Sequence, residues 1–347
     1  MHSTLLSDTL HVAPVADIRA EPINIHWDES LPVFAKEEFL KAVGDEYGWL
    51  GGHDTSQHLR CILPYTIIRK AGLRLVRFRV QTIPMGDGLN LHEEKSFLNS
   101  VVRYFRNAGA DVIVPASNNA IFRTYPDGAD AAPYGSYIID LRMAEELLWK
   151  QINRTVRLNI GTAQRAGITV ADESRNIDSA YDLIKETFAR SKIAFMDRDS
   201  FRKYVHGLGS NGSILVAKYL DAPHSFCLFG YSKHCAYAIY AGNILQQHQG
   251  ANKLLYWEAI RRFREQNVSM FDFVGARINP EKGSKQESIN LMKKRFGATL
   301  IDGYMWKYPL RPLRSRVYTI GVRLLRGGDL VDQERHKLKQ DRTPVAD

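Results

Sequence analysis

The sequence predicts an α/β (α+β) protein with two domains, each a mixed sheet flanked by helices. A strand-like run at 235–242 leads through a polar loop into an amphipathic helical segment at 252–267, and a second apolar strand follows at 269–276. A similar passage from helix to strand occurs at 103–115, where Arg, Phe and Arg recur at the offsets seen in 261–273. The length of 347 residues is sufficient for two domains of ordinary size.

The remaining segments fit this two-domain plan. The first domain is expected over 1–140 and includes an antiparallel hairpin at 61–82. A single connecting helix is expected over 141–167, and the second domain over 168–310. The final segment, 311–347, is expected to return to the first domain.

Composition and missing motifs exclude several classes of protein. The three cysteines form no CxxC pair, which suits a reducing cytoplasm and argues against a cysteine metal site; we expect no metal. The chain has no GxSxG, HExxH, GxxxxGK[ST] or strand-linked GxGxxG motif, so a hydrolase, zinc protease, kinase or dinucleotide enzyme is disfavoured. The net charge of +9 is compatible with nucleic acid, an anionic membrane or a phosphorylated substrate, or simply with a solvated basic surface.

The loop before the helical segment at 252–267 is a candidate phosphate site. Gln247, Gly250 and Ala251 lead into Asn252, which is placed to cap the helix. Unpaired N–H groups and the positive end of the helix dipole suit a pyrophosphate, and Gly250 would allow close backbone approach. The alternative is an ordinary turn between a strand and a helix.

Several motifs together resemble a known family. They are YWEAIRRFREQN, FDFVGA and the element Met292–Gly297, which reads MKKRFG, preceded by the junction LLWKQINRTVRLNIGTAQRAGITV. In this order and spacing, 133–312 resembles the FemAB-like branch of the GNAT (Gcn5-related N-acetyltransferase) superfamily. Met292 stands where the family's F-K-x-x-F-G element has its first Phe. The resemblance implies tandem GNAT-like domains, with the acyltransferase domain in the second half.

The resemblance also implies an activity. The first hypothesis is a cytoplasmic N-acyltransferase that moves an acyl group from acyl-CoA to the amino group of a small or nucleotide-linked acceptor, such as an amino sugar, by direct attack. This activity would serve cell envelope or polysaccharide biosynthesis. The second hypothesis is aminoacyl transfer from a charged tRNA to a peptidoglycan precursor, as in the Fem proteins. The third is a non-catalytic, degenerate GNAT-like protein that binds a ligand or the membrane surface.

Three residues are candidates for the chemistry. Asp272 lies between Phe271 and Phe273, where burial would raise its pKa toward the range of a general base; alternatively, it accepts backbone N–H groups at a strand end. Lys293 matches the lysine of the family's F-K position, thought to face the donor, or is a solvated helix lysine. Tyr240 could donate its O–H to the tetrahedral intermediate, or belong to the core.

The acceptor would be held by other residues. Arg198 and Tyr204 resemble a family Arg–Tyr pair that holds a phosphorylated acceptor, although their spacing departs from the family pattern. Tyr134 and Tyr304 could line a groove between the domains, or simply pack.

The C-terminal basic segment has two interpretations. Apolar residues recur at helical spacing among arginines, at Leu313, Val317, Ile320, Leu324 and Leu325. We expect this stripe to pack on the first domain. The alternative is a helix that binds peripherally to an anionic membrane.

Overall fold

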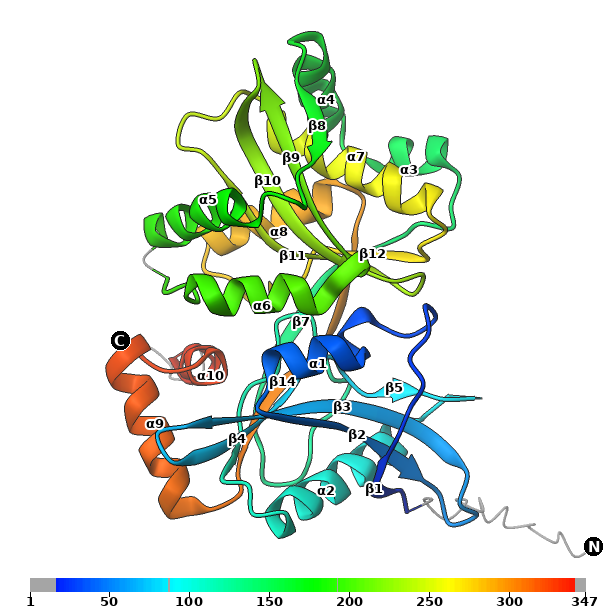
Figure 1. Cartoon of the computed structure of the whole chain (residues 1–347), viewed down its shortest axis with the longest axis vertical. Coiled ribbons are helices and arrows are strands. Elements are labelled where there is room, and N and C mark those ends of the chain that lie inside the picture. Colours follow the sequence, from blue (N-terminus) through cyan, green and yellow to red (C-terminus); the bar gives the residue numbers. More distant parts are fainter. Residues whose placement is uncertain (1–16, 87, 192, 341–347) are drawn as a thin grey trace, which may run out of the picture.

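The computed structural model describes residues 17–86, 88–191 and 193–340. The ends of the expected first domain and of the expected C-terminal return, 1–16 and 341–347, lie outside the described residues. Figure 1 shows two halves stacked along the long axis of the molecule, with a sheet and covering helices in each. This arrangement confirms the predicted mixed α/β fold.

Runs of strands and helices follow one another along the chain. The strands are β1 (Arg19–Ile23), β2 (Glu46–His53), β3 (Leu59–Lys70), β4 (Leu73–Phe78), β5 (Ile83–Pro84), β6 (Val112–Ile113), β7 (Asp130–Asp140), β8 (Thr169–Asp172), β9 (Gly212–Tyr219), β10 (Ala222–Tyr231), β11 (Ala236–Asn243), β12 (Met270–Asp272), β13 (Ala276–Arg277) and β14 (Thr299–Pro309). The helices are η1 (Val33–Ala35), α1 (Glu37–Val43), α2 (Leu91–Asn107), α3 (Glu145–Gln151), α4 (Arg154–Arg165), α5 (Ile177–Arg190), α6 (Arg198–Leu208), η2 (Gly209–Asn211), α7 (Ala251–Glu265), α8 (Lys285–Arg295), α9 (Pro312–Arg326) and α10 (Leu330–Gln340).

Two long strands join the halves. The hydrogen-bonded order of the strands is β1-β2-β3-β4-β6-β14-β7-β12-β11-β10-β9-β8, so β14 and β7 lie in the middle. Most of β14 pairs antiparallel with β7, while its last residues, Tyr308 and Pro309, pair with β6 of the first half. On its other edge, β7 pairs with β12 and β13 of the second half. The domain limits at 140 and 310 therefore stay a prediction, because the strands that end there link the two halves.

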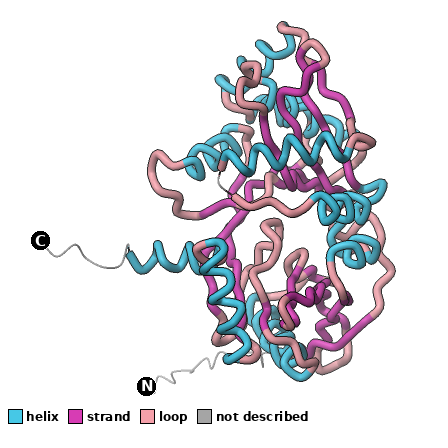
Figure 2. Tube along the Cα trace, turned by 60° about the vertical axis from the view of Figure 1, so that its left-hand side comes forward, coloured by secondary structure: helices cyan, strands magenta, loops and turns pink. Residues whose placement is uncertain are grey.

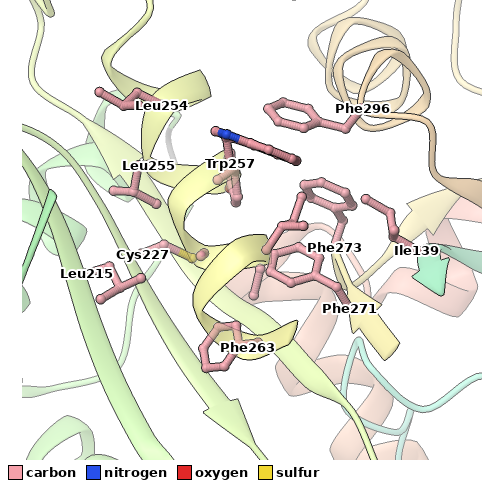
Figure 3. Close-up of a cluster of buried hydrophobic side chains, with 14 of the residues drawn as sticks. Ile139, Leu215, Cys227, Leu254, Leu255, Trp257, Phe263, Phe271, Phe273 and Phe296 are labelled. Carbon is pink, nitrogen blue, oxygen red and sulfur yellow. The ribbon is translucent and has the colours of Figure 1, made fainter. Parts of the chain in front are cut away.

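Each half has its own apolar core. In the first half, a reciprocal cap between Asn90 and Glu93 starts α2, which then lays its apolar face on the sheet. In the second half, α7 packs against the sheet, and Figure 3 shows Trp257 beside the rings of Phe273 and Phe296. Helix packing thus covers the sheet in each half.

A third core lies between the halves. Helix α1 of the first half packs on α6 of the second, and a Cβ added at Gly207 would lie 2.6 Å from that of Ala42, which shows how closely these helices approach. Aromatic pairs cross the same boundary: Phe34 lies 4.9 Å from Tyr237 and Phe39 lies 5.1 Å from Tyr204 between ring centroids. These contacts continue the apolar packing from one half into the other.

The expected single connecting helix over 141–167 is two helices. Helix α3 ends at Gln151 because Ile152 and Asn153 are extended, and α4 begins directly afterwards. The side chain of Asn153 accepts the N–H of Thr155 and so caps α4. Sequence periodicity continues across the break, because both helices place apolar residues on the same core.

The described part of the C-terminal segment contacts the first half, and it does so through the face opposite to the apolar stripe. Ser315 of α9 is buried and Tyr318 packs on Leu73 and its neighbours, whereas Leu313 and Leu324 are 76% and 82% exposed. The expectation that the apolar stripe packs on the first domain is therefore wrong, because the face containing Ser315 and Tyr318 makes the contact. In Figure 2 the two C-terminal helices lie at the edge of the molecule. Within the described part of the chain, no helix is both long and apolar enough to cross a bilayer.

Helix α10 is held on the sheet by a buried ion pair, which gives a stability prediction. The ammonium group of Lys307 on β14 is 2.9 Å from Asp329 and 2.6 Å from Asp332. Lys307→Met leaves partly buried carboxylates without their cation, so we expect the free energy of unfolding to fall by about 3 kcal/mol. Arg142→Met, which breaks an exposed pair with Asp140, serves as the control and should have almost no effect in the same denaturant titration. Equal losses in both variants would contradict this role of Lys307.

Candidate active site

Asp272 lies at the end of β12, in the middle of the molecule. Its carboxylate is buried and accepts hydrogen bonds from the Ser136 hydroxyl and from the N–H of Val274, the latter at 2.7 Å. Phe271 and Phe273 point the other way, into the core of the second half (Figure 3). The alternative expected for this residue, a carboxylate that accepts a backbone N–H at a strand end, is thus observed.

Lys293 lies on α8 and turns inward rather than toward solvent. It is only 5% exposed, so the alternative of a solvated helix lysine is wrong. Its ammonium donates to the carbonyl oxygens of Val274, at 2.8 Å, and Gly275. Both of these residues adopt positive φ, 50° and 69°, which is strained for a β-branched valine. An ammonium has three N–H donors, so one remains beyond these two carbonyls.

Burial moves both pKa values toward neutrality. Desolvation raises the pKa of Asp272 to about 6, although the hydrogen bonds from Ser136 and Val274 and the charge of Lys293 oppose it. Desolvation also lowers the pKa of Lys293 to about 8, against the opposing effect of the Asp272 charge. Near pH 7 the site therefore holds a carboxylate and an ammonium, each close to its titration range. Groups tuned in this way are typical of acid–base chemistry.

Two neighbouring strands diverge beside this pair. The parallel strands β11 and β12 pair only at Ala236–Phe271 and Tyr237–Asp272, because β12 stops while β11 continues to Asn243. The register between β10 and β11 also shifts at Ile239, which is a β-bulge. Backbone polar groups on the free part of β11 are thus available to an extended ligand in the gap.

The loop after β11 carries the candidate phosphate site at the start of α7. Gly250, not Asn252, is the N-cap residue, with φ of 86°, because the helix begins at Ala251. Among the described residues, the backbone N–H groups of Asn252 and Lys253 donate to no carbonyl. The side-chain oxygens of Gln247 and Asn252 are buried without a partner. These unsatisfied groups fit a polar ligand at this helix end.

Tyr240 lies apart from Asp272 and Lys293. It is half-buried in an aromatic group, with ring centroids 5.1 Å from Phe195 and 5.8 Å from Tyr204. Burial raises the pKa of its hydroxyl, and the guanidinium of Arg79 opposes that rise. The structure therefore does not unite the three predicted catalytic residues: it brings together Asp272 and Lys293, and it places Tyr240 at the boundary between the halves.

The predicted acceptor residues are not assembled into one site. Arg198 forms ion pairs with Asp178 and Asp182 on α5, so carboxylates already occupy the guanidinium that was expected to bind a phosphate. Tyr204, on the same helix, is half-buried and packs in the aromatic group with Phe39 and Tyr240 instead. Arg198 and Tyr204 are six residues apart, so they lie on different faces of α6.

The two remaining tyrosines lie on opposite faces of the β7–β14 pair. Tyr304 is opposite Pro133, while Tyr134 is opposite Gly303, and alternate residues point to opposite sides. Tyr134 shares a face with Ser136 and Asp272, since Asp272 pairs with Ile138. Tyr134 is thus near the Asp272 carboxylate, and Tyr304 packs against Tyr125 on the other side.

Sequence reasoning missed two residues. Ser136, which hydrogen-bonds Asp272, lies 136 positions earlier on a strand whose pairing could not be foreseen. Arg79 is buried between the halves and donates to Thr66 and to the carbonyl of Val43, and no carboxylate of the described residues lies within ion-pair distance. A buried cation without a counter-ion is costly and often marks a functional site. In the sequence, Arg79 belongs to the strand-like run LRLVRFRVQT, and nothing in that run marks it as a functional residue.

Comparisons with known proteins agree with this geometry. Residues 150–282 match the family model of the acetyltransferase (GNAT) domain, which confirms the predicted resemblance to GNAT proteins. The structure of FemX has a TM-score of 0.60 over 83% of this chain and 94% of that chain, at 13% identity. The C-terminal domain (DUF2156) of a putative lysylphosphatidylglycerol synthetase from Agrobacterium fabrum has a TM-score of 0.50 over 82% of this chain and 91% of that chain, also at 13% identity.

A conserved protein of unknown function from Bacteroides thetaiotaomicron has a TM-score of 0.50, with 84% of this chain and 99% of that chain covered at 12% identity. No curated protein sequence matches the chain. At such low identity the solved structures show a shared fold alone. The family match ends at residue 282, so Lys293 lies beyond it.

Gly250 allows a test of packing at the start of α7. A Cβ at this position would collide with the carbonyl oxygen of Asn159 on α4, and its φ is positive. Gly283 has a positive φ of 76° but nothing within 4 Å of an added Cβ. Gly283→Ala should therefore show only the backbone cost, and Gly250→Ala should lose about 1–3 kcal/mol more in a denaturant titration. If both variants lose the same stability, the close approach of α4 to α7 is wrong.

Proposed function

We propose that the protein is an N-acyltransferase that moves an acyl group from acyl-CoA to the amino group of a small or nucleotide-linked acceptor, such as an amino sugar. The observation that carries this proposal is the buried Asp272–Lys293 pair beside the gap between β11 and β12. The match of 150–282 to a GNAT domain supports the reaction class. The acceptor amine attacks the donor carbonyl directly, and no covalent enzyme intermediate is required.

The two charged groups have complementary roles in this proposal. The Asp272 carboxylate accepts the proton that the attacking amine must lose, and Ser136 holds that carboxylate in place. The remaining N–H donor of Lys293 stabilises the oxyanion of the tetrahedral intermediate, because the Val274 and Gly275 carbonyls orient the ammonium. The tetrahedral intermediate then collapses with cleavage of its C–S bond, and CoA leaves as a thiolate, which takes up the proton held by Asp272.

The donor is proposed to extend from this pair along the free edge of β11 to the start of α7. Its phosphates would meet the N–H groups of Asn252 and Lys253, which are unsatisfied within the described chain. Gln247, Gly250 and Ala251 complete that end of the site. The alternative donor is an aminoacyl-tRNA, favoured by the net charge of +9 and by the fold shared with FemX. In that case the proposed acceptor is a peptidoglycan precursor.

Removal of either charged group should affect turnover more than stability. We expect Asp272→Asn and Lys293→Ala each to lower kcat by on the order of 10²–10⁴-fold, because a positioned acid–base or oxyanion group is lost. Lys294→Ala removes the exposed neighbouring lysine and should leave kcat unchanged. Turnover and thermal unfolding are measured for all three variants. Near-normal kcat in the first two would remove both residues from the mechanism.

The pKa values predict a bell-shaped pH profile. As pH rises through about 6, Asp272 loses its proton and becomes a competent base, so kcat/KM rises. As pH rises through about 8, Lys293 loses its positive charge and kcat/KM falls. The profile should be measured with an acceptor amine that titrates outside this range. Ser136→Ala removes a hydrogen bond that favours the charged carboxylate, so the lower limb should move to higher pH; an unmoved limb would separate Asp272 from that titration.

The class of donor can be decided by binding. We expect acetyl-CoA to raise the melting temperature of the full chain, with saturation, because it binds the folded second half. A charged tRNA at the same concentration is the competing donor. Stabilisation and transfer with tRNA alone would select the aminoacyl-tRNA mechanism, and no binding of either would favour a non-catalytic GNAT-like protein.

A further inference from the structure

The outward face of α9 is apolar and has no partner in the described part of the chain. Leu313, Val317, Ile320 and Leu324 follow one another at spacings of four, three and four residues, which places them on one side of the helix. All four are more than half exposed, from 56% at Val317 to 82% at Leu324. Leu325 beside them is also exposed. An exposed apolar stripe of this kind is typical of a surface that contacts another molecule or a membrane.

The opposite face of α9 is firmly attached, so the stripe cannot simply rotate inward. Ser315 donates its hydroxyl hydrogen to the Asp111 carbonyl at 3.0 Å, and Arg314 forms a 2.7 Å ion pair with the Asp111 carboxylate. Tyr318 packs on an apolar group that includes Leu73 and Val112. These contacts fix the orientation of α9 on the edge of the first half (Figure 1), and the leucines at positions 313 and 324 are left exposed to solvent.

The charges around the stripe are positive. The sequence of α9 contains no Asp or Glu. Arg316 and Arg323 flank the stripe and are exposed, and no described carboxylate lies within ion-pair distance of either. On the packed side, Arg311 and Arg314 share the single carboxylate of Asp111.

The basic surface continues past the helix. A hollow of about 410 Å³ beside α9 is lined by Arg69, Gly72, Leu73 and Arg74. Both of its arginines pair with the single carboxylate of Glu46. Arg314 reaches the same edge, where it donates to the carbonyl of Gly72. An apolar stripe with a basic border thus lies beside a basic hollow.

We propose that α9 docks the protein on a bilayer that contains anionic phospholipid. The stripe enters the boundary between headgroups and acyl chains, while the flanking arginines meet lipid phosphates. A second copy of the chain fits this surface less well. In a symmetric dimer through α9 the same face meets itself, so Arg316 and Arg323 would approach the identical arginines without acidic partners on the helix. An anionic bilayer supplies both the apolar phase and the opposite charge.

Vesicle flotation tests this docking with the full-length protein. Vesicles of phosphatidylcholine alone are compared with vesicles that also contain phosphatidylglycerol. We expect flotation with the anionic vesicles, weakened at high salt, and little with phosphatidylcholine alone. Leu313→Gln combined with Leu324→Gln removes apolar contact, and Arg316→Gln combined with Arg323→Gln removes charge. Each pair should weaken binding by on the order of 10-fold or more.

A matched control distinguishes binding through α9 from non-specific binding through any exposed leucine. Leu220→Gln changes a leucine that is 83% exposed in the turn between β9 and β10. This variant should float as well as the wild-type protein. Thermal unfolding confirms that each variant is folded, since all five positions are exposed. The proposal is overturned if the protein does not float, or if the α9 variants float as well as the Leu220 control. It is also overturned if size-exclusion chromatography shows a dimer that the leucine pair abolishes.

Discussion

The antiparallel pairing of β7 with β14 is the constraint on which the rest of the structure depends. These strands carry hydrogen bonds from Thr299 to Lys307 on one side and from Asp130 to Ile138 on the other. Because β14 also reaches β6, and β7 also reaches β12, each half is built around a strand that the other half helps to position. The apolar packing of α1 on α6 then closes the boundary between the halves.

The candidate active site follows from that pairing. Ser136 is on β7, Asp272 is on β12 directly beside it, and the turn at Val274 and Gly275 continues from β12 toward β13. Lys293 on α8 fills the space left by this left-handed turn and satisfies its carbonyls. An unpaired carbonyl or ammonium in this position would be costly, so the strained turn and the buried lysine require each other. The same arrangement buries Asp272 and Lys293, and burial brings their pKa values to about 6 and about 8.

Candidate functional surfaces are thus distributed over both halves and the C-terminal segment. The second half carries the gap between β11 and β12 and the unsatisfied start of α7. The boundary between the halves buries Arg79 beside Tyr204 and Tyr240, without a described carboxylate near it. Helix α9 exposes an apolar stripe on the outer edge.

The sequence by itself determined much of the fold. Apolar residues at helical spacing located α7, and strand-like runs located β3, β4 and β11, because local periodicity reports which face of an element is buried. It also identified Asp272 and Lys293 through short motifs. Only the tertiary structure decided that Ser136 joins them, that Tyr240 does not, and that Arg198 is occupied by Asp178 and Asp182. Those facts depend on which strands pair and which helices touch, and contacts between distant residues leave no periodic trace in the chain. For the same reason, periodicity correctly predicted an amphipathic helix at α9 but could not show which of its faces would be turned to the protein.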